Sequence, residues 1–278
     1  MVEFSLIIGT LNRTKELQAC LESIKLQICD SYEIIIVDQS DNNKTRELVE
    51  KSSDGRIKYI YTDIKGLSHA RNIGIKEASG KYLCLLDDDA VYPPQYLETI
   101  KNLIGEDRIV SGVIFSIDDY KTPFINYQKC LDGKEMSVTR IVEACPSAAL
   151  AFPRNLVLQI GGFNECLGVG NEFAAGEETE FLLRALDARY SVIHSKKTIA
   201  YHPIKPVDYS NLKGVYKHAM GKGALYKIEC KRGHKIRLLL FAMKNTIGMI
   251  IKMFLERDKK SFYKARYSGF ANGYRSFK

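Results

Sequence analysis

The sequence lacks paired cysteines, an apolar leader segment and repeated or low-complexity tracts. Its seven cysteines are scattered and none belongs to a CxxC pair, so the pattern indicates free thiols rather than a disulfide framework or a zinc site. Met1 leads directly into an apolar strand, without a basic region or a small-residue cleavage motif. We therefore expect no signal peptide and a chain whose start remains in the cytoplasm.

Charge is distributed unevenly along the 278 residues, whose net charge is +8. Residues 206–278 contain 17 Lys and Arg against 4 Asp and Glu, a net charge of +13. The preceding 205 residues contain 24 and 29 of these, a net charge of −5. A strongly basic region predicts an anionic partner, such as phospholipid, a polyanionic substrate or nucleic acid. The alternative is a solvated basic face without a partner.

Residues 236–255 are mostly apolar but contain Arg237, Lys244 and Lys252, which gather with Asn245 on one arc of a helical wheel. These charges argue against a membrane span and favour a helix that lies in a membrane interface. Flanking cations would meet anionic headgroups: Lys231, Arg232, Lys235, Arg257, Lys259 and Lys260. The alternative is an apolar face that docks on the rest of the chain or on a second subunit.

The first 90 residues alternate apolar strands with helical patterns, which predicts a parallel sheet covered by helices. Further strands are expected in the second half, two of them short. The chain is thus an α/β domain over residues 1–205, with halves 1–90 and 91–205, and a basic helical extension over residues 206–278. The expected strands are 4–10, 33–38, 57–61, 82–86, 109–115, 145–152, 191–194 and 198–201.

Polar residues follow three of the expected strands, at the sheet edge where α/β proteins bind their ligands. The most conspicuous is the run Asp87-Asp88-Asp89. Three adjacent carboxylates repel one another unless a cation neutralises them, and their oxygens suit Mg²⁺ or Mn²⁺. In an extended backbone Asp87 and Asp89 point the same way and Asp88 points away. A solvated acidic turn is the alternative.

Two glutamates, Glu177 and Glu178, begin a predicted helix. Helical spacing predicts a core-facing side with Glu178, Phe181, Leu182 and Ala185, and an outer side with Glu177, Glu180 and Arg184. A carboxylate that faces inward is a candidate general base, so Glu178 is preferred. The alternative is that both glutamates only stabilise the helix dipole.

Three further residues have chemistry that suits a phosphate-metal site. His202 follows a predicted strand and is a candidate metal ligand, although a packed histidine is the alternative. Arg13 and Arg71 are candidates to neutralise phosphate oxygens, although each alone is more often a surface residue.

Together these segments resemble the family 2 glycosyltransferases, which have the GT-A fold. The resemblance covers about residues 3–205. It is carried by residues 5–13 (SLIIGTLNR), 33–40 (EIIIVDQS), 66–72 (GLSHARN), 86–89 (LDDD) and 176–180 (GEETE).

The resemblance implies a role for each matching position. Thr10 and Asp38 would hold the nucleotide base, with Arg13 and Arg71 near the diphosphate. Glu178 would be the catalytic base, at a position where the family usually has Asp. Gly9 and Leu11 also depart from the family pattern, which more often has Pro and Tyr there. The implied donor-binding set is Thr10, Asn12, Arg13, Asp38, Arg71, Asp87 and Asp88, and the implied metal ligands are Asp89, Asp87 and His202.

The implied activity is an inverting, metal-dependent transfer of a hexosyl or related group, with Mn²⁺ or Mg²⁺. The donor would be a nucleotide sugar, preferably a UDP-sugar, and the acceptor a saccharide or lipid-linked hydroxyl. Such an enzyme would act in cell-surface polysaccharide or glycolipid synthesis, in the cytoplasm or on the inner face of the cell membrane, which it would contact through residues 206–278. A homodimer is left open.

Two other activities remain as alternatives. A sugar-nucleotide pyrophosphorylase would need a Gly-rich phosphate loop after the first strand, which residues 9–13 do not provide. A non-catalytic basic module that binds nucleic acid fits the basic extension, but the acidic sheet edge argues against a nucleic-acid partner.

Overall fold

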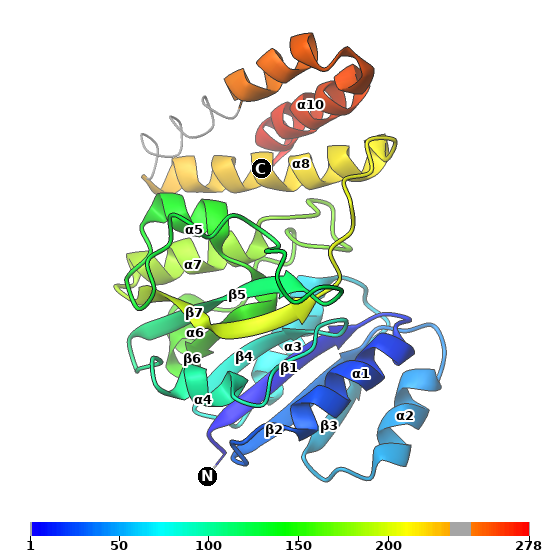
Figure 1. The fold of residues 1–278 in the computed structure, drawn as a ribbon, viewed down its shortest axis with the longest axis vertical. Coiled ribbons are helices and arrows are strands. Elements are labelled where there is room, and N and C mark those ends of the chain that lie inside the picture. Colours follow the sequence, from blue (N-terminus) through cyan, green and yellow to red (C-terminus); the bar gives the residue numbers. More distant parts are fainter. Residues whose placement is uncertain (1, 234–245, 278) are drawn as a thin grey trace. The chain divides into compact units, whose positions relative to one another are not determined.

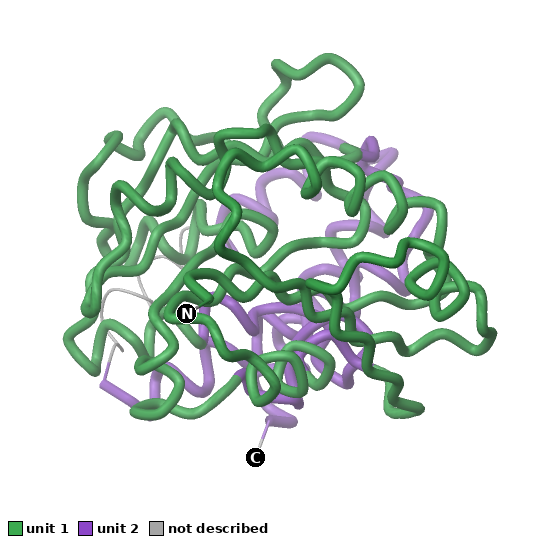
Figure 2. The backbone as a smooth tube through the Cα atoms, turned by 90° about the horizontal axis from the view of Figure 1, so that it is seen from below, with its two compact units in different colours: residues 1–65, 69–162, 181–204 green, residues 66–68, 163–180, 205–278 purple. Residues whose placement is uncertain are grey.

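The computed structural model describes residues 2–233 and 246–277, and these divide into two compact units (Figure 2). Unit 1 comprises residues 1–65, 69–162 and 181–204. Unit 2 comprises residues 66–68, 163–180 and 205–278. Arg237, Lys244 and Asn245, which the helical-wheel prediction used, lie outside the described residues, as does Lys235.

Unit 1 is built on a seven-stranded sheet, as far as the chain is described, with strand order β3-β2-β1-β4-β6-β5-β7. Neighbouring strands are parallel except at β6, which runs antiparallel to both β4 and β5. The predicted α/β class with a mainly parallel sheet is confirmed. The strands are β1 (Phe4–Thr10), β2 (Tyr32–Asp38), β3 (Ile57–Tyr61), β4 (Tyr82–Asp87), β5 (Arg108–Ser116), β6 (Leu150–Pro153) and β7 (Ser191–His202).

Helices cover both faces of this sheet (Figure 1). Alternate residues of β1 show the division: Leu6 and Ile8 pack in a core with helix α1, whereas Ile7 faces Gly74 of α3. Strands that are covered on both faces are mostly apolar along their length, which is why β1, β2 and β4 could be predicted from the sequence. The helices are α1 (Thr14–Lys25), α2 (Lys44–Ser52), α3 (Leu67–Glu77), α4 (Tyr96–Lys101), α5 (Val138–Ala144), α6 (Arg154–Ile160) and α7 (Glu177–Asp187), with a 3-10 turn η1 (Ser147–Ala149).

Two predictions about the second half were wrong. The strand expected at 145–152 is a 3-10 turn over Ser147–Ala149 followed by the short strand β6, Leu150–Pro153. The two short strands expected at 191–194 and 198–201 are parts of the single strand β7. The exposed pair Lys196-Lys197 interrupted the apolar pattern, but these residues lie in a bulge of β7. The pairing with β5 shifts register there, between Ser111 and Val113, and continues on both sides.

Unit 2 contains the helices predicted for the basic extension. They are α8 (Leu212–Arg232), residues 246–255, the 3-10 turn η2 (Arg257–Lys259) and α10 (Lys260–Ser276). α8 and α10 approach very closely: a Cβ on Gly273 would lie 2.0 Å from the Met220 carbonyl oxygen, and one on Gly223 would lie 2.1 Å from that of Phe270. Glycine is therefore required at both positions. Among the described residues, no helix has the length and apolar character of a membrane span.

Candidate active site

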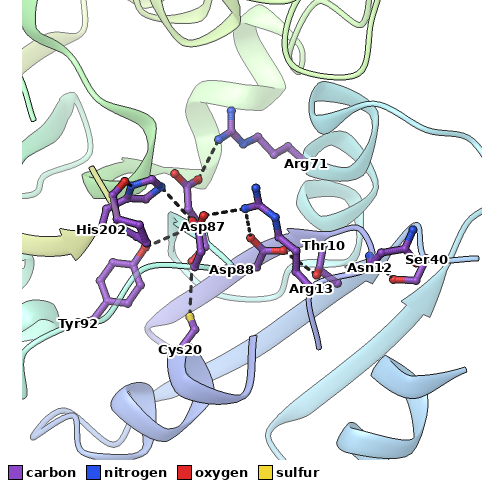
Figure 3. A network of polar contacts seen from close by, with 12 residues as sticks. Thr10, Asn12, Arg13, Cys20, Ser40, Arg71, Asp87, Asp88, Tyr92 and His202 are labelled. Atoms are coloured by element: carbon purple, nitrogen blue, oxygen red, sulfur yellow. Dashed lines mark hydrogen bonds and ion pairs between the residues drawn. The ribbon is translucent and has the colours of Figure 1, made fainter. Parts of the chain in front are cut away.

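The carboxyl ends of β1, β4 and β7 bring their polar residues to one edge of the unit 1 sheet (Figure 3). The end of β7 reaches the acidic run through paired backbone hydrogen bonds between Val91 and Tyr201, at 2.8 and 2.9 Å. This bridge explains why His202, 113 residues later in the chain, lies beside Asp89. The sheet topology thus assembles residues that the sequence separates.

Asp89 lies between the guanidinium of Arg13 and the imidazole of His202. Its Oδ1 is 2.9 Å from Nε2 of His202, and its Oδ2 is 2.7 Å from Nη1 of Arg13. Burial alone would raise the pKa of Asp89, but His202 and Arg13 outweigh burial and hold the pKa below its usual value. Burial alone would lower the pKa of His202, but the hydrogen bond and charge of Asp89 raise it. The carboxylate is thus kept ionised.

The acidic run does not alternate as an extended strand would. β4 ends at Asp87, and a turn follows that the Ala90 amide closes on the Asp87 carbonyl oxygen at 3.2 Å. Asp88 is consequently not isolated from Asp89, because Arg13 Nη1 contacts both carboxylates, at 3.2 and 2.7 Å. The prediction that Asp88 points away from Asp89 assumed that the strand continued through residue 89, and it was wrong for that reason.

Asp88 joins β4 to β1. Its Oδ2 accepts a hydrogen bond of 2.7 Å from the Thr10 hydroxyl, in a buried position. Burial raises the pKa of Asp88 to about 6, although Thr10 and Arg13 oppose this effect. Thr10 is itself buried, so its hydroxyl serves this contact in the described structure.

Asp89 and His202 fit a divalent cation in two respects. The His202 Nδ1 lies 2.8 Å from the Pro203 carbonyl oxygen, a contact that favours a proton on Nδ1 and leaves Nε2 free to act as a ligand when a cation replaces its proton. The 2.9 Å between Nε2 and Asp89 Oδ1 matches the roughly 3.0 Å between adjacent ligands of an octahedral cation with bonds of about 2.1 Å. Over residues 2–233 and 246–277, no three His, Cys, Asp or Glu side chains converge as a ready-made metal cluster. The pair would therefore hold the cation, and other ligands would come from donor oxygens and water.

Asp87 faces a buried arginine. Arg71 of α3 is 1% exposed, and its Nη2 lies 3.5 Å from Asp87 Oδ1. The backbone of Asp87 is fixed from the other side, because its amide donates to the Tyr92 hydroxyl at 2.9 Å and its carbonyl oxygen lies 3.6 Å from the Cys20 thiol. A buried guanidinium at this edge provides a fixed positive charge close to the acidic run.

The ends of β1 and β2 are tied together by Asn12. This residue has φ of 58°, and its amide donates to the Ser40 hydroxyl at 2.8 Å. Its side chain contacts Asp41 at 3.1 Å. Asp38 is buried and accepts hydrogen bonds of 2.9 Å from the Ser40 amide and from the Tyr59 hydroxyl. Asn12 thus shapes the backbone of the predicted donor pocket, in a left-handed conformation that asparagine tolerates.

A groove of about 570 Å³ lies beside His202 in unit 1. The segment that follows β5 folds back along it, with the Phe124 amide donating to the Ile114 carbonyl oxygen at 2.9 Å. The exposed Phe124 ring meets His202 edge-on, at 5.7 Å between ring centroids. Phe124 therefore lines the groove and also contacts His202, the candidate metal ligand. It is lined by Val113, Phe115, Pro123, Phe124, Ile125, Asn126, Tyr127, Gln128 and Lys196.

Glu178 belongs to the part of α7 that lies in unit 2, and its side chain is half-buried. It interacts electrostatically with His218 of α8. Part of His218 remains exposed to solvent. Desolvation of its imidazole and the charges of Lys222 and Arg266 lower the pKa of His218 to about 4, whereas the charge of Glu178 acts to raise it.

The predicted division of α7 into two faces was wrong for the glutamates. Phe181, Leu182 and Ala185 are buried as expected, but Glu177 and Glu180 are only 3% and 1% exposed. The reason lies within unit 2, to which both glutamates belong. Arg232 of α8 donates to Glu180 at 2.7 Å and to the buried Glu229 at 3.0 Å.

The sequence reasoning missed three residues that shape the site: Tyr59, Tyr92 and Phe124. Tyr92 follows the acidic run by only three residues, so its closeness to Asp87 could have been predicted from the sequence. Tyr59 and Phe124 had no local signal, because their partners Asp38 and His202 lie 21 and 78 residues away. Only strand pairing reveals these contacts.

Relatives in sequence are glycosyltransferases. One is an uncharacterised glycosyltransferase of Haemophilus influenzae, 28% identical over 188 residues, a match that covers 66% of this chain and 61% of the relative. Another is glycosyltransferase AglE of Haloferax volcanii, 26% identical over 210 residues, covering 73% of this chain and 67% of the relative.

Solved structures share the fold at low sequence identity. Mannosyltransferase PcManGT of Pyrobaculum calidifontis, in complex with GDP-Man and Mn²⁺, has a TM-score of 0.66 at 14% identity, covering 98% of this chain and 86% of that one. TarS 1–349 of S. aureus in complex with UDP has a TM-score of 0.61 at 15% identity, covering 99% and 90%. The model of glycosyl transferase family 2 matches residues 5–152, which contain β1 to β4 and the acidic run. The chain spans 61% of the length of the Haemophilus influenzae relative. It therefore belongs to glycosyl transferase family 2 and has the GT-A fold.

Proposed function

We propose that the chain transfers a sugar from a nucleotide-sugar donor to a hydroxyl acceptor, with inversion at the anomeric carbon and with dependence on Mn²⁺ or Mg²⁺. The observation that supports this most directly is the Asp89–His202 pair, separated by 2.9 Å at the carboxyl ends of β4 and β7. A cation held there would neutralise the donor diphosphate and the charge that develops on it as the bond to the sugar breaks.

The arginines of the site support donor binding. Arg13 lies against Asp88 and Asp89, and Arg71 lies near Asp87, so both guanidinium groups border the predicted diphosphate position. Guanidinium groups form paired hydrogen bonds with phosphate oxygens, and a buried one is already oriented. Thr10, Asn12 and Asp38 would complete the donor pocket on the β1 and β2 side. We favour a UDP-sugar as the donor.

Glu178 is the proposed base. It would remove the proton from the acceptor hydroxyl, which attacks the anomeric carbon on the face opposite the leaving nucleotide. Its half-buried carboxylate at the start of α7 suits a group that must meet an acceptor and still exchange protons. The groove beside His202 is the proposed acceptor side, with a saccharide or lipid-linked acceptor resting on its aromatic wall.

The cellular setting is proposed on the same basis. A transferase with a basic extension suits cell-surface polysaccharide or glycolipid synthesis on the cytoplasmic face of the membrane, which residues 206–278 would contact. The acidic sheet edge, with three carboxylates in sequence, does not suit a nucleic-acid partner.

Hydrolysis of the donor tests the function without knowledge of the acceptor. The enzyme is incubated with UDP-GlcNAc, UDP-glucose, UDP-galactose and GDP-mannose, each with MnCl₂ or with excess chelator, and nucleoside diphosphate release is measured. We expect release from one donor that the chelator abolishes. Release of UTP or GTP when pyrophosphate is added, in place of the diphosphate, would instead identify a pyrophosphorylase.

Glu178→Gln tests the base. We expect transfer to fall by at least about a hundredfold, while the donor dissociation constant, measured by calorimetry, changes less than threefold. Glu47→Gln, an exposed position on α2, is the matched control and should behave as wild type. Once an acceptor is found, NMR of the first product should show the inverted anomer. Equal loss of donor binding in Glu178→Gln, or a retained anomer, would refute this role.

A further inference from the structure

Residues 246–255 of unit 2 carry an exposed apolar face. Phe254 and Leu255 are 74% and 78% exposed, although both are large hydrophobic residues. Side chains of this kind rarely gather on a surface without a partner. The full set, termed the 247–255 face, is Ile247, Ile250, Ile251, Phe254 and Leu255.

The spacing of these residues places them together on the helix. Their positions follow the i, i+3, i+4, i+7, i+8 pattern, and at about 100° per residue they span roughly 140° of the circumference. Met249, on the opposite side, is buried within the molecule. Lys252 lies outside the apolar arc and places its ammonium 5.9 Å from the centre of the Tyr263 ring. The helix therefore already has one packed side, and the 247–255 face is a second apolar side that faces outward.

The chain segment that contains this face and continues to the last residue is basic. Residues 246–278 contain eight Lys and Arg against two acidic residues, Glu256 and Asp258. Glu256 accepts hydrogen bonds from Lys259 and from the Tyr263 hydroxyl, at 3.0 and 2.9 Å, so its charge is offset locally. Arg257 and Lys260 are exposed and follow Leu255 by two and five residues. An apolar face with a cationic border complements an anionic bilayer, in which headgroups surround an apolar interior.

We propose that the 247–255 face docks on an anionic lipid bilayer, with the helix parallel to the membrane surface. This inference deepens the membrane contact of the proposed function, because it assigns that contact to one helix face and to one class of lipid. Lys252 within the segment, and Arg257 and Lys260 just after it, favour a helix that lies in the interface over one that crosses the bilayer. Docking would hold the enzyme at the surface where lipid-linked acceptors are found.

Flotation of the full-length protein tests the proposal. Vesicles of phosphatidylcholine with 30% phosphatidylglycerol are compared with vesicles of phosphatidylcholine alone, at 0.1 M salt. We expect wild type to float with the anionic vesicles at least about tenfold better than with the neutral ones, because several cations each strengthen attraction to anionic lipid. Raising the salt to 0.5 M should weaken this binding.

Two variants distinguish lipid binding by the 247–255 face from nonspecific hydrophobic adsorption to vesicles. Phe254→Glu with Leu255→Glu should weaken binding to anionic vesicles at least about thirtyfold, because it removes two apolar groups that would enter the bilayer and adds two negative charges. Leu158→Glu is the matched control: Leu158 is 82% exposed, on α6 of unit 1, and its replacement should change binding less than twofold.

Three results would overturn the proposal. They are equal flotation of wild type and the double variant, equal binding to neutral and anionic vesicles, and a dimer in solution that the double variant dissociates, which would assign the face to a second copy of the chain. Donor hydrolysis is measured on the same samples without vesicles. Its retention in the double variant separates failure of docking from failure of the proposed enzymatic function.

Discussion

We expect Mn²⁺ to stabilise this protein and Asp89→Asn to remove most of that stabilisation. The substitution preserves the shape of the side chain but replaces a charged ligand with a neutral amide. Asp89 also lies 2.7 Å from Arg13 and 2.9 Å from His202, so both groups lose a carboxylate partner. Asp63→Asn, at an exposed position after β3, is the matched control.

The size of the effect follows from binding linkage. At a free Mn²⁺ concentration of 100 times the dissociation constant, the wild type gains about 2.7 kcal/mol of stability. A fiftyfold weaker site, within the tenfold to hundredfold range typical of disturbed metal sites, gains only about 0.6 kcal/mol at the same concentration. For a chain of this size 1 kcal/mol shifts Tm by roughly 2–4 °C. Mn²⁺ should then raise Tm by roughly 5–11 °C in wild type and by roughly 1–3 °C in the variant.

The measurement is a thermal shift series in which MnCl₂ is titrated in the presence of UDP, against a chelator baseline. Asp63→Asn should reproduce the wild-type shift. An Asp89→Asn variant that retains the full shift would show that Asp89 is not a ligand, and the geometric argument for the Asp89–His202 pair would fail.

Two predictions concern stability. Burial raises the pKa of Asp88 from its ordinary value of 3.8 to about 6. Folding therefore favours the neutral form of Asp88, and the stability gained from it is lost as pH rises from about 4 through 6. The shift corresponds to about 3 kcal/mol. The free energy of unfolding of Asp88→Asn, measured with urea, should therefore exceed that of wild type by up to about 3 kcal/mol at pH 8 and equal it near pH 4. A variant less stable than wild type at pH 8 would refute the assignment. Arg232→Met removes the cation that contacts the buried Glu180 and Glu229, and it should lower the free energy of unfolding by about 3–5 kcal/mol. Adding Glu180→Gln should restore part of that stability, because it removes one of the two buried charges. A loss under 1 kcal/mol would contradict the buried ion-pair interpretation.

Much of the fold was predictable because its strands are buried on both faces. β1, β2 and β4 consist of continuous apolar residues, so their positions did not depend on distant partners. β7 was harder, because Lys196-Lys197 break its pattern and only pairing with β5 keeps it one strand. Local periodicity predicts elements well when burial is uniform along them, and poorly where a bulge intervenes.

Residue types at the site were predictable, but their directions were not. The sequence indicated that Asp87, Asp88, Asp89, Arg13 and His202 belong to one sheet edge, because each follows a strand. It did not indicate that β4 ends before Asp88 or that Arg13 contacts both following carboxylates. Those features depend on where hydrogen bonding of the strand stops, which neighbouring strands determine.

The sequence by itself determined the α/β class, the family motifs and the contrast between an acidic body and a basic extension, since all three depend on composition and local order. Tertiary structure alone decided which charges meet. It placed His202 against Asp89 through the Val91–Tyr201 bridge, and it covered Glu180 with Arg232. A helix or strand carries its own periodicity in its sequence, but the group that neutralises a buried charge comes from wherever the fold brings another part of the chain.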